Sequence, residues 1–118
     1  MFNIAVFFGG KSVEHDISII TAMQAMRGLK NYNVIPVYIL PDGRFVTGKK
    51  LKRSQSFLNF KLSGCRFLTF EMGKANLLIL SKNKIKEKIK IDVHGAPDTL
   101  QPSDAYRANM ALSNALEQ

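Results

Sequence analysis

The chain has 118 residues, of which 46% are hydrophobic and 22% are charged. These values are typical of one globular domain that can bury a core without metals or disulfides. The composition excludes a disulfide scaffold because there is one cysteine, and no stretch approaches the roughly 18 apolar residues of a membrane helix. The first residues do not read as a signal peptide either, so we expect a cytoplasmic protein.

The net charge is +8, which raises the question of an anionic partner. The basic residues gather in two stretches, 44–66 and 82–90. Charge runs of this kind are usually solvated faces of a folded domain. We therefore interpret them as surface and do not expect a nucleic-acid partner or a membrane partner.

Residues 2–8 are an apolar run of strand length, with strong β formers at both odd and even positions. That pattern predicts a central parallel strand that is buried on both faces. The loop at the strand exit follows, and glycines there allow positive φ and a close approach to a ligand. Ligands of open α/β sheets bind beyond the carboxyl ends of strands, so we expect the site at this loop, which consists of Gly9, Gly10, Lys11 and Ser12.

The next segment, residues 14–29, carries one apolar stripe at helical spacing. Ser12 can cap this helix, and Gly28 with the polar cluster after it predicts its end. Residues 34–40 then read as a second strand, in which Pro36 favours a position near an edge or a strand start. Strand, helix and strand together predict the opening of a right-handed βαβ unit.

The second half of the chain reads mainly as strands. Residues 47–64 predict a short helix or a loop, whereas 65–70 and 76–80 predict a hairpin. Lysine stands at every second position of 82–90, and Ile85, Ile89 and Ile91 fall on the other parity, which predicts a half-exposed edge strand. A last helix is expected within 102–118.

We therefore expect an α/β fold with a Rossmann-like, largely parallel sheet, flanking helices and one antiparallel hairpin. One domain would cover residues 1–101. Residues 102–118 would add a C-terminal helix packed on the same domain.

The segment from Ile4 to Ser18, running on into Ala22 and Ala25, closely resembles the opening of the D-alanine–D-alanine ligases of the ATP-grasp superfamily. It shares their strand, their Gly-Gly turn and their Ser-x-Glu-x-x-(Val/Ile)-Ser helix start. The resemblance extends with falling strength to about residue 93. It implies the Rossmann-like N-terminal domain of that family.

The resemblance also implies roles for individual residues. Glu14 matches the catalytic-site glutamate that contacts the ammonium of the first D-alanine, and Ile17 matches an aliphatic residue that lines the same subsite. His94, followed by Gly95, matches a histidine of that pocket, although the apolar strand residues that the family has before it are absent here. On the residues alone, Glu14 could instead merely complement the helix dipole.

Two functions follow from the sequence. The first is the N-terminal substrate-binding domain, or a truncated relative, of a ligase that joins two D-alanines with ATP and magnesium for peptidoglycan precursors. The family's ATP site and magnesium ligands lie in later domains, so we expect this chain to bind D-alanine but no metal or ATP. It would be inactive alone, would need ATP-grasp domains in cis or in trans, and could form a homodimer. The alternative is a non-catalytic binding or assembly module that acts through a partner protein or an anionic surface.

Overall fold

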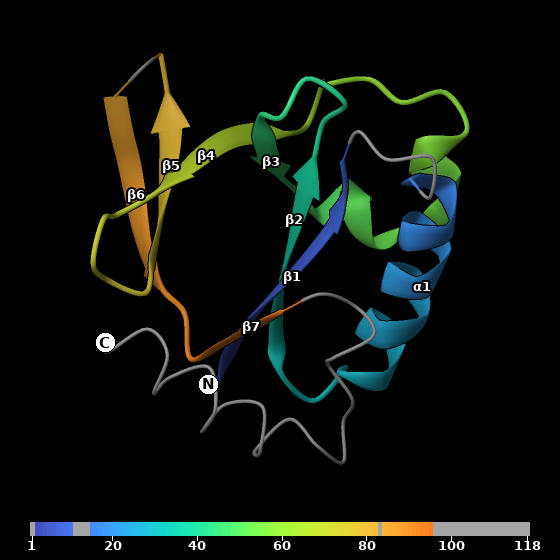
Figure 1. The fold of residues 1–118 in the computed structure, drawn as a ribbon, viewed down its shortest axis with the longest axis horizontal. Coiled ribbons are helices and arrows are strands. Elements are labelled where there is room, and N and C mark those ends of the chain that lie inside the picture. Colours follow the sequence, from blue (N-terminus) through green and yellow to red (C-terminus); the bar gives the residue numbers. More distant parts are fainter. Residues whose placement is uncertain (1, 11–14, 83, 96–118) are drawn as a thin grey trace.

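The computed structural model describes residues 2–10, 15–82 and 84–95, and within these ranges residues 15–18 and 93 are described by their backbone alone. The elements follow one another along the chain in the order shown in Figure 1. They are β1 (Asn3–Gly9), α1 (His15–Gly28), β2 (Asn33–Ile39), β3 (Phe45–Thr47), the short 3₁₀ helices η1 (Lys49–Lys52) and η2 (Ser54–Phe57), β4 (Arg66–Phe70), β5 (Asn76–Ser81), β6 (Lys84–Lys90) and β7 (Val93–Gly95).

The seven strands form one mixed sheet in the order β6-β5-β4-β3-β2-β1-β7. The prediction of a largely parallel sheet is therefore wrong. Only the β1–β2 and β1–β7 pairs are parallel, and the other four pairs are antiparallel. The reason lies in the connections, because parallel neighbours need a crossover of a dozen or more residues, whereas the chain after β2 repeatedly turns straight back.

The helices also differ from the prediction. In the described part of the chain α1 is the one α-helix, and η1 and η2 are single 3₁₀ turns within the segment expected to be a short helix or a loop. No helix among these residues is long and apolar enough to cross a membrane. The predicted helix within 102–118 lies outside the described residues.

Strand β1 is the central parallel strand that the sequence predicts, since it pairs in parallel with β2 on one side and β7 on the other. Ile4, Ala5 and Val6 are fully buried. Pro36 lies within β2 rather than at its start, yet β3 pairs with β2 only at Tyr38 and Ile39. On the side of β2 that faces β3, no ladder hydrogen bond is therefore needed at Pro36. This suits proline, because it has no N–H to donate.

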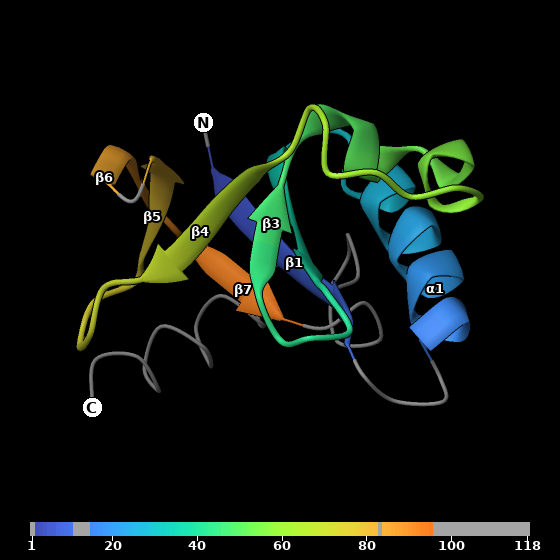
Figure 2. The same cartoon turned by 90° about the horizontal axis from the view of Figure 1, so that it is seen from above.

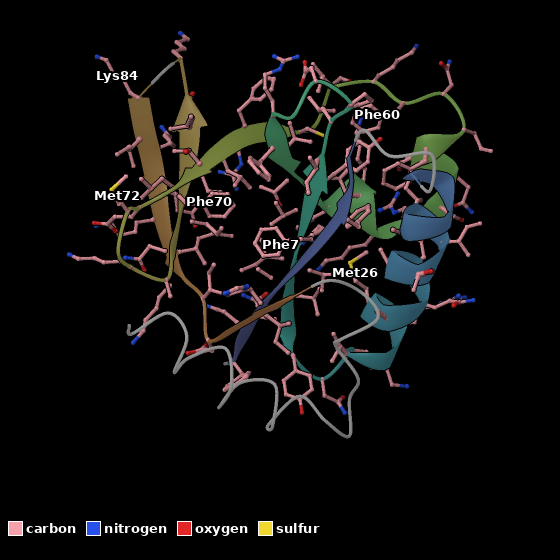
Figure 3. The ribbon with its side chains drawn as sticks, in the orientation of Figure 1. Phe7, Met26, Phe60, Phe70, Met72 and Lys84 are labelled. Carbon is pink, nitrogen blue, oxygen red and sulfur yellow. The ribbon has the colours of Figure 1, made fainter. Side chains whose placement is uncertain are left out.

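The first core lies between the sheet and α1. Figure 1 shows α1 lying against one face of the sheet. Alternate residues of β1 belong to this core, and α1 contributes the apolar stripe expected from the sequence. In Figure 3, Met26 points from α1 toward the sheet. The buried members from these two elements are Ile4, Val6, Phe8, Ile19, Ala22, Met23 and Met26.

The second core lies on the opposite face of the sheet and joins strands that are not neighbours. The rings of Phe7 on β1 and Phe70 on β4 have centroids 5.7 Å apart, although β2 and β3 lie between these strands. Three strand spacings in a flat sheet would separate them by about 14 Å. The sheet is therefore strongly curved, so that its own strands cover this core, which includes Ala5, Ile35, Val37, Leu68, Leu77, Ile79 and Ile91.

The lysine-rich segment forms β6, an edge strand as predicted. The prediction that it is half-exposed is wrong, because six of its seven residues are exposed, Ile85 among them, and Ile89 is half-buried. Figure 2 shows β6 at the far side of the sheet from α1. Positive charge along a free edge disfavours pairing with further strands, which keeps such an edge soluble.

Candidate functional site

The exit of β1 is a corner built from two glycines. Gly9 has φ +94° and Gly10 has φ +98°, which are values that side chains with a Cβ adopt rarely. The Gly10 N–H donates to the carbonyl oxygen of Ile39 at 2.8 Å, which ties the corner to the end of β2. The corner is thus anchored to the neighbouring strand.

An aromatic cluster packs behind this corner and excludes any side chain at Gly9. A Cβ built there would lie 2.6 Å from the Tyr38 ring and 2.7 Å from the Ile39 carbonyl oxygen. Tyr38 is itself fixed by Phe8, Phe57 and Phe60, whose ring centroids lie 5.5, 5.1 and 5.0 Å from its own. The corner therefore rests on packing that reaches from β1 to η2.

The remaining loop residues and the glutamate predicted from the sequence follow Gly10 in the chain. Lys11, Ser12 and Glu14 fall outside the described residues. Ile17 lies in the first turn of α1, and its side chain is not described. Of the predicted site residues near the exit of β1, the structure therefore describes Gly9 and Gly10 in full and Ile17 by its backbone alone.

His94 lies elsewhere along the sheet. The Asn3 N–H donates to Asp92 Oδ2 at 2.7 Å, and the Asp92 N–H donates to the Asn3 carbonyl at 2.9 Å. These bonds align the start of β7 with the start of β1, so that His94 pairs with Ala5. At about 3.3 Å per residue it lies about 13 Å short of Gly9, on the face of the sheet opposite α1.

The imidazole of His94 lines a hollow of about 350 Å³. It meets the Phe7 ring edge-on, with centroids 5.7 Å apart, and Phe70 forms another wall. Burial lowers the pKa of His94, so the neutral form is favoured there.

Glu71 lies at the same hollow and is already engaged by neighbours. Its carboxylate accepts from Asn76 Nδ2 at 2.7 Å and pairs with Lys88 Nζ at 3.3 Å. The hydrogen bond from Asn76 is the main reason that its pKa is lowered, with Lys88 and Lys74 adding to the effect. The carboxylate is therefore a structural partner of this hairpin.

The position of His94 makes stability depend on pH. The folded-state pKa lies below the unfolded value, so the unfolded chain binds the proton more readily, and stability falls as pH drops from about 6.5 through the folded pKa. We expect the urea midpoint to fall between pH 7.5 and 5.5, and His94→Gln to remove most of that fall. His15→Gln is the matched control, because the chain has two histidines. An unchanged pH dependence in His94→Gln would contradict the burial of this imidazole.

The described residues offer no metal centre. No group of three or more His, Cys, Asp or Glu side chains in them is placed to hold an ion. The residue that sequence reasoning missed is Tyr38, whose ring explains why Gly9 must be glycine. Its signal was an aromatic residue on the strand beside the diglycine, with Phe57 and Phe60 following in the next segment.

Solved structures share this fold. The VanG D-Ala:D-Ser ligase from Enterococcus faecalis matches 79% of the chain with a TM-score of 0.62 at 21% identity. The D-alanine–D-alanine ligase from Helicobacter pylori matches 80% with a TM-score of 0.59 at 24% identity. By architecture, the chain is thus an α/β unit of the type found in this class of ligases.

Sequence comparison then identifies the family. The family model described as "D-ala D-ala ligase N-terminus" matches residues 3–97, and the chain belongs to that family. The D-alanine–D-alanine ligase of Thermosipho melanesiensis is 53% identical over 62 residues, which are 51% of this chain and 17% of the relative. That of Bacillus pumilus is 30% identical over 84 residues, which are 70% of this chain and 21% of the relative.

The matched region is a minor part of each relative. It spans about a fifth or less of the length of the two relatives found by sequence, and 27% and 29% of the length of the two solved chains. Family membership therefore identifies a domain. It does not by itself assign the activity of a whole ligase to this chain.

Proposed function

We propose that this chain is the N-terminal D-alanine-binding unit of a D-alanine–D-alanine ligase. The observation that supports it best is the diglycine corner at the exit of a central parallel strand, leading into α1, in a chain of this family. A corner of this kind lets backbone approach a ligand closely, and the helix start beyond it offers unpaired N–H groups.

Glu14 is the proposed ammonium contact. It follows the corner by four residues, and a carboxylate there would pair with the positive end of an amino acid in a charge-assisted hydrogen bond. Ile17 would line the same subsite with its aliphatic side chain. Lys11 and Ser12 would complete the loop, with the Ser12 hydroxyl capping the helix.

His94 is the second proposed contributor to substrate binding. Its neutral imidazole could donate or accept a hydrogen bond in the hollow that it lines with Phe7. It pairs with Ala5, about 13 Å along β1 from Gly9, which is more than the length of one D-alanine. It would therefore act through the shape of the hollow and not by touching a D-alanine at the corner, and its contribution should be smaller than that of Glu14.

The chemistry itself would come from ATP-grasp domains, in cis or in trans. In the proposed reaction, ATP transfers its terminal phosphoryl group to the carboxylate of one D-alanine and leaves as ADP, and the amine of a second D-alanine attacks the acyl phosphate and displaces inorganic phosphate. Magnesium and positively charged groups of those domains would neutralise the developing charge. This chain would bind and orient the first D-alanine for peptidoglycan precursor synthesis in the cytoplasm.

Turnover tests this division of labour. We expect no phosphate release from ATP and D-alanine with the chain alone. Adding the ATP-grasp domains of the Thermosipho melanesiensis relative should produce release, and Glu14→Gln should reduce it by about tenfold or more, as expected for losing a charged hydrogen bond. Turnover by the isolated chain, or equal rates with the Glu14→Gln variant, would contradict the proposal.

A second candidate is a binding module without chemistry, and the exposed lysines of β6 favour it. Such a module would meet an acidic partner along this edge and would ignore D-alanine. Heparin retention that persists at high salt, together with no response to D-alanine, would select this function over the first.

A further inference from the structure

A basic groove runs between α1 and the two 3₁₀ helices. It consists of two adjoining hollows of about 230 and 420 Å³, which share Met23, Arg27 and Lys52 in their walls. Figures 1 and 2 show the η1–η2 segment against α1, away from β5 and β6. Sites for small ligands typically measure about 300–1,000 Å³, so the larger hollow is of that size.

Four cations converge on this groove from two separate segments. Arg27 lies in the last turn of α1 and Lys30 follows its end, whereas Lys52 and Arg53 lie where η1 meets η2. All four residues are exposed, although the walls of the groove partly shield the Lys52 ammonium from water, and no carboxylate is among the described residues of the walls. The ion pairs of the described part use Asp42, Glu71 and Glu87 with other cations.

This charge is therefore uncompensated within the described structure. Burial lowers the pKa of Lys52, and repulsion from Lys49 lowers it further. A bound anion would stabilise the ammonium form and oppose that repulsion. Stabilisation of the α1 dipole could explain Arg27 and Lys30, but it does not explain Lys52 and Arg53, which belong to another segment.

The floor of the groove is apolar. Met23 and Met26 are buried beneath the cations, and Ile20 is 60% exposed at the side of the larger hollow. Ser54 and Gln55 add neutral hydrogen-bonding groups. A ligand that fits this lining has an organic part that packs on the apolar floor and several negative charges that pair with the cations at the rim. Among anions, guanidinium groups bind phosphate especially well.

We propose that this groove binds a small organic polyphosphate of nucleotide size. A nucleic-acid strand is a poorer fit, because its backbone needs a continuous basic track. Here the other basic cluster, on β6, lies at the far side of the sheet, as Figure 1 shows. This site is separate from the corner at the exit of β1, so it stands whether or not D-alanine binds.

Calorimetric titration of the full chain at 150 mM salt with ADP and with inorganic tripolyphosphate tests the proposal. We expect saturable one-to-one binding of both, with ADP at least as tight because of the apolar floor. The double variant Arg27→Gln, Lys52→Gln should weaken it on the order of tenfold or more, since each change removes a charged hydrogen bond. Lys84→Gln, Lys86→Gln removes the same net charge on β6 and should change affinity by less than about twofold.

Three results would overturn the proposal. One is the absence of saturable binding. Another is equal weakening by the two double variants, which would indicate general attraction to a basic protein. The third is a single-stranded oligonucleotide that binds tighter than ADP and is weakened equally by both variants. Arg53→Gln alone, at an exposed position between η1 and η2, should weaken binding severalfold and provides a second variant that leaves α1 intact.

Discussion

Replacing Gly9 by alanine is expected to destabilise the fold by about 2–4 kcal/mol, which is among the larger single changes that this domain should show. Two costs add. Alanine at φ +94° pays about 1 kcal/mol or more in backbone strain. Its Cβ would also lie within 3.0 Å of the Tyr38 ring and of the Ile39 carbonyl oxygen, so the strand or the ring must move.

Gly10→Ala is the matched control for this change. Gly10 has nearly the same φ, +98°, but a Cβ there meets no atom of the described residues within 4 Å. Gly10→Ala should therefore lower the free energy of unfolding only by the backbone strain, about 1 kcal/mol. Urea unfolding of both variants separates the two effects, and equal destabilisation would show that the Tyr38 contact does not determine the need for glycine at this position.

The first half of the fold could be predicted because its signals are local. The apolar run before Gly9 and the helical stripe ending at Gly28 each report a burial pattern that the structure repeats. The lysines of β6 correctly predicted an edge strand, but Ile85 is exposed, so the expected alternation of exposed and buried residues does not hold there. Family resemblance added the functional reading, which periodicity alone could not supply.

The sheet direction could not be predicted in the same way. The sequence of a buried strand such as β5 has the same apolar pattern whether its neighbours are parallel or antiparallel. The curvature of the sheet that brings Phe7 to Phe70 depends on contacts between residues far apart in the sequence. The Rossmann-like expectation extended the parallel β1–β2 pair to the whole sheet. The short turns after β2 override that expectation.

The place of His94 was equally hidden. The residue type and its following glycine were visible in the sequence, but its depth along β7 is set by the bonds between Asn3 and Asp92. Those bonds align the two strand starts. A three-residue strand then brings the histidine to Ala5 instead of to the corner.

Glu14→Gln is expected to weaken D-alanine binding by about tenfold or more. The physical reason is the loss of a charge-assisted hydrogen bond to an ammonium group, which typically contributes about 1.5–3 kcal/mol. Glutamine keeps the size of the side chain, so folding should be unaffected. Glu87→Gln removes a carboxylate from β6, the edge strand at the other end of the sheet from β1 and β7, and should leave the affinity unchanged.

The measurement that tests the central claim most directly is an NMR titration of the isotope-labelled chain with D-alanine, followed at the Gly9 and Gly10 amides. We predict saturable shifts at both glycines, a much weaker response to L-alanine, and loss of the D-alanine response in Glu14→Gln. Glycine amides that stay unmoved by D-alanine, or a Glu14→Gln variant that responds like the unmodified chain, would contradict the assignment of a D-alanine site at the exit of β1.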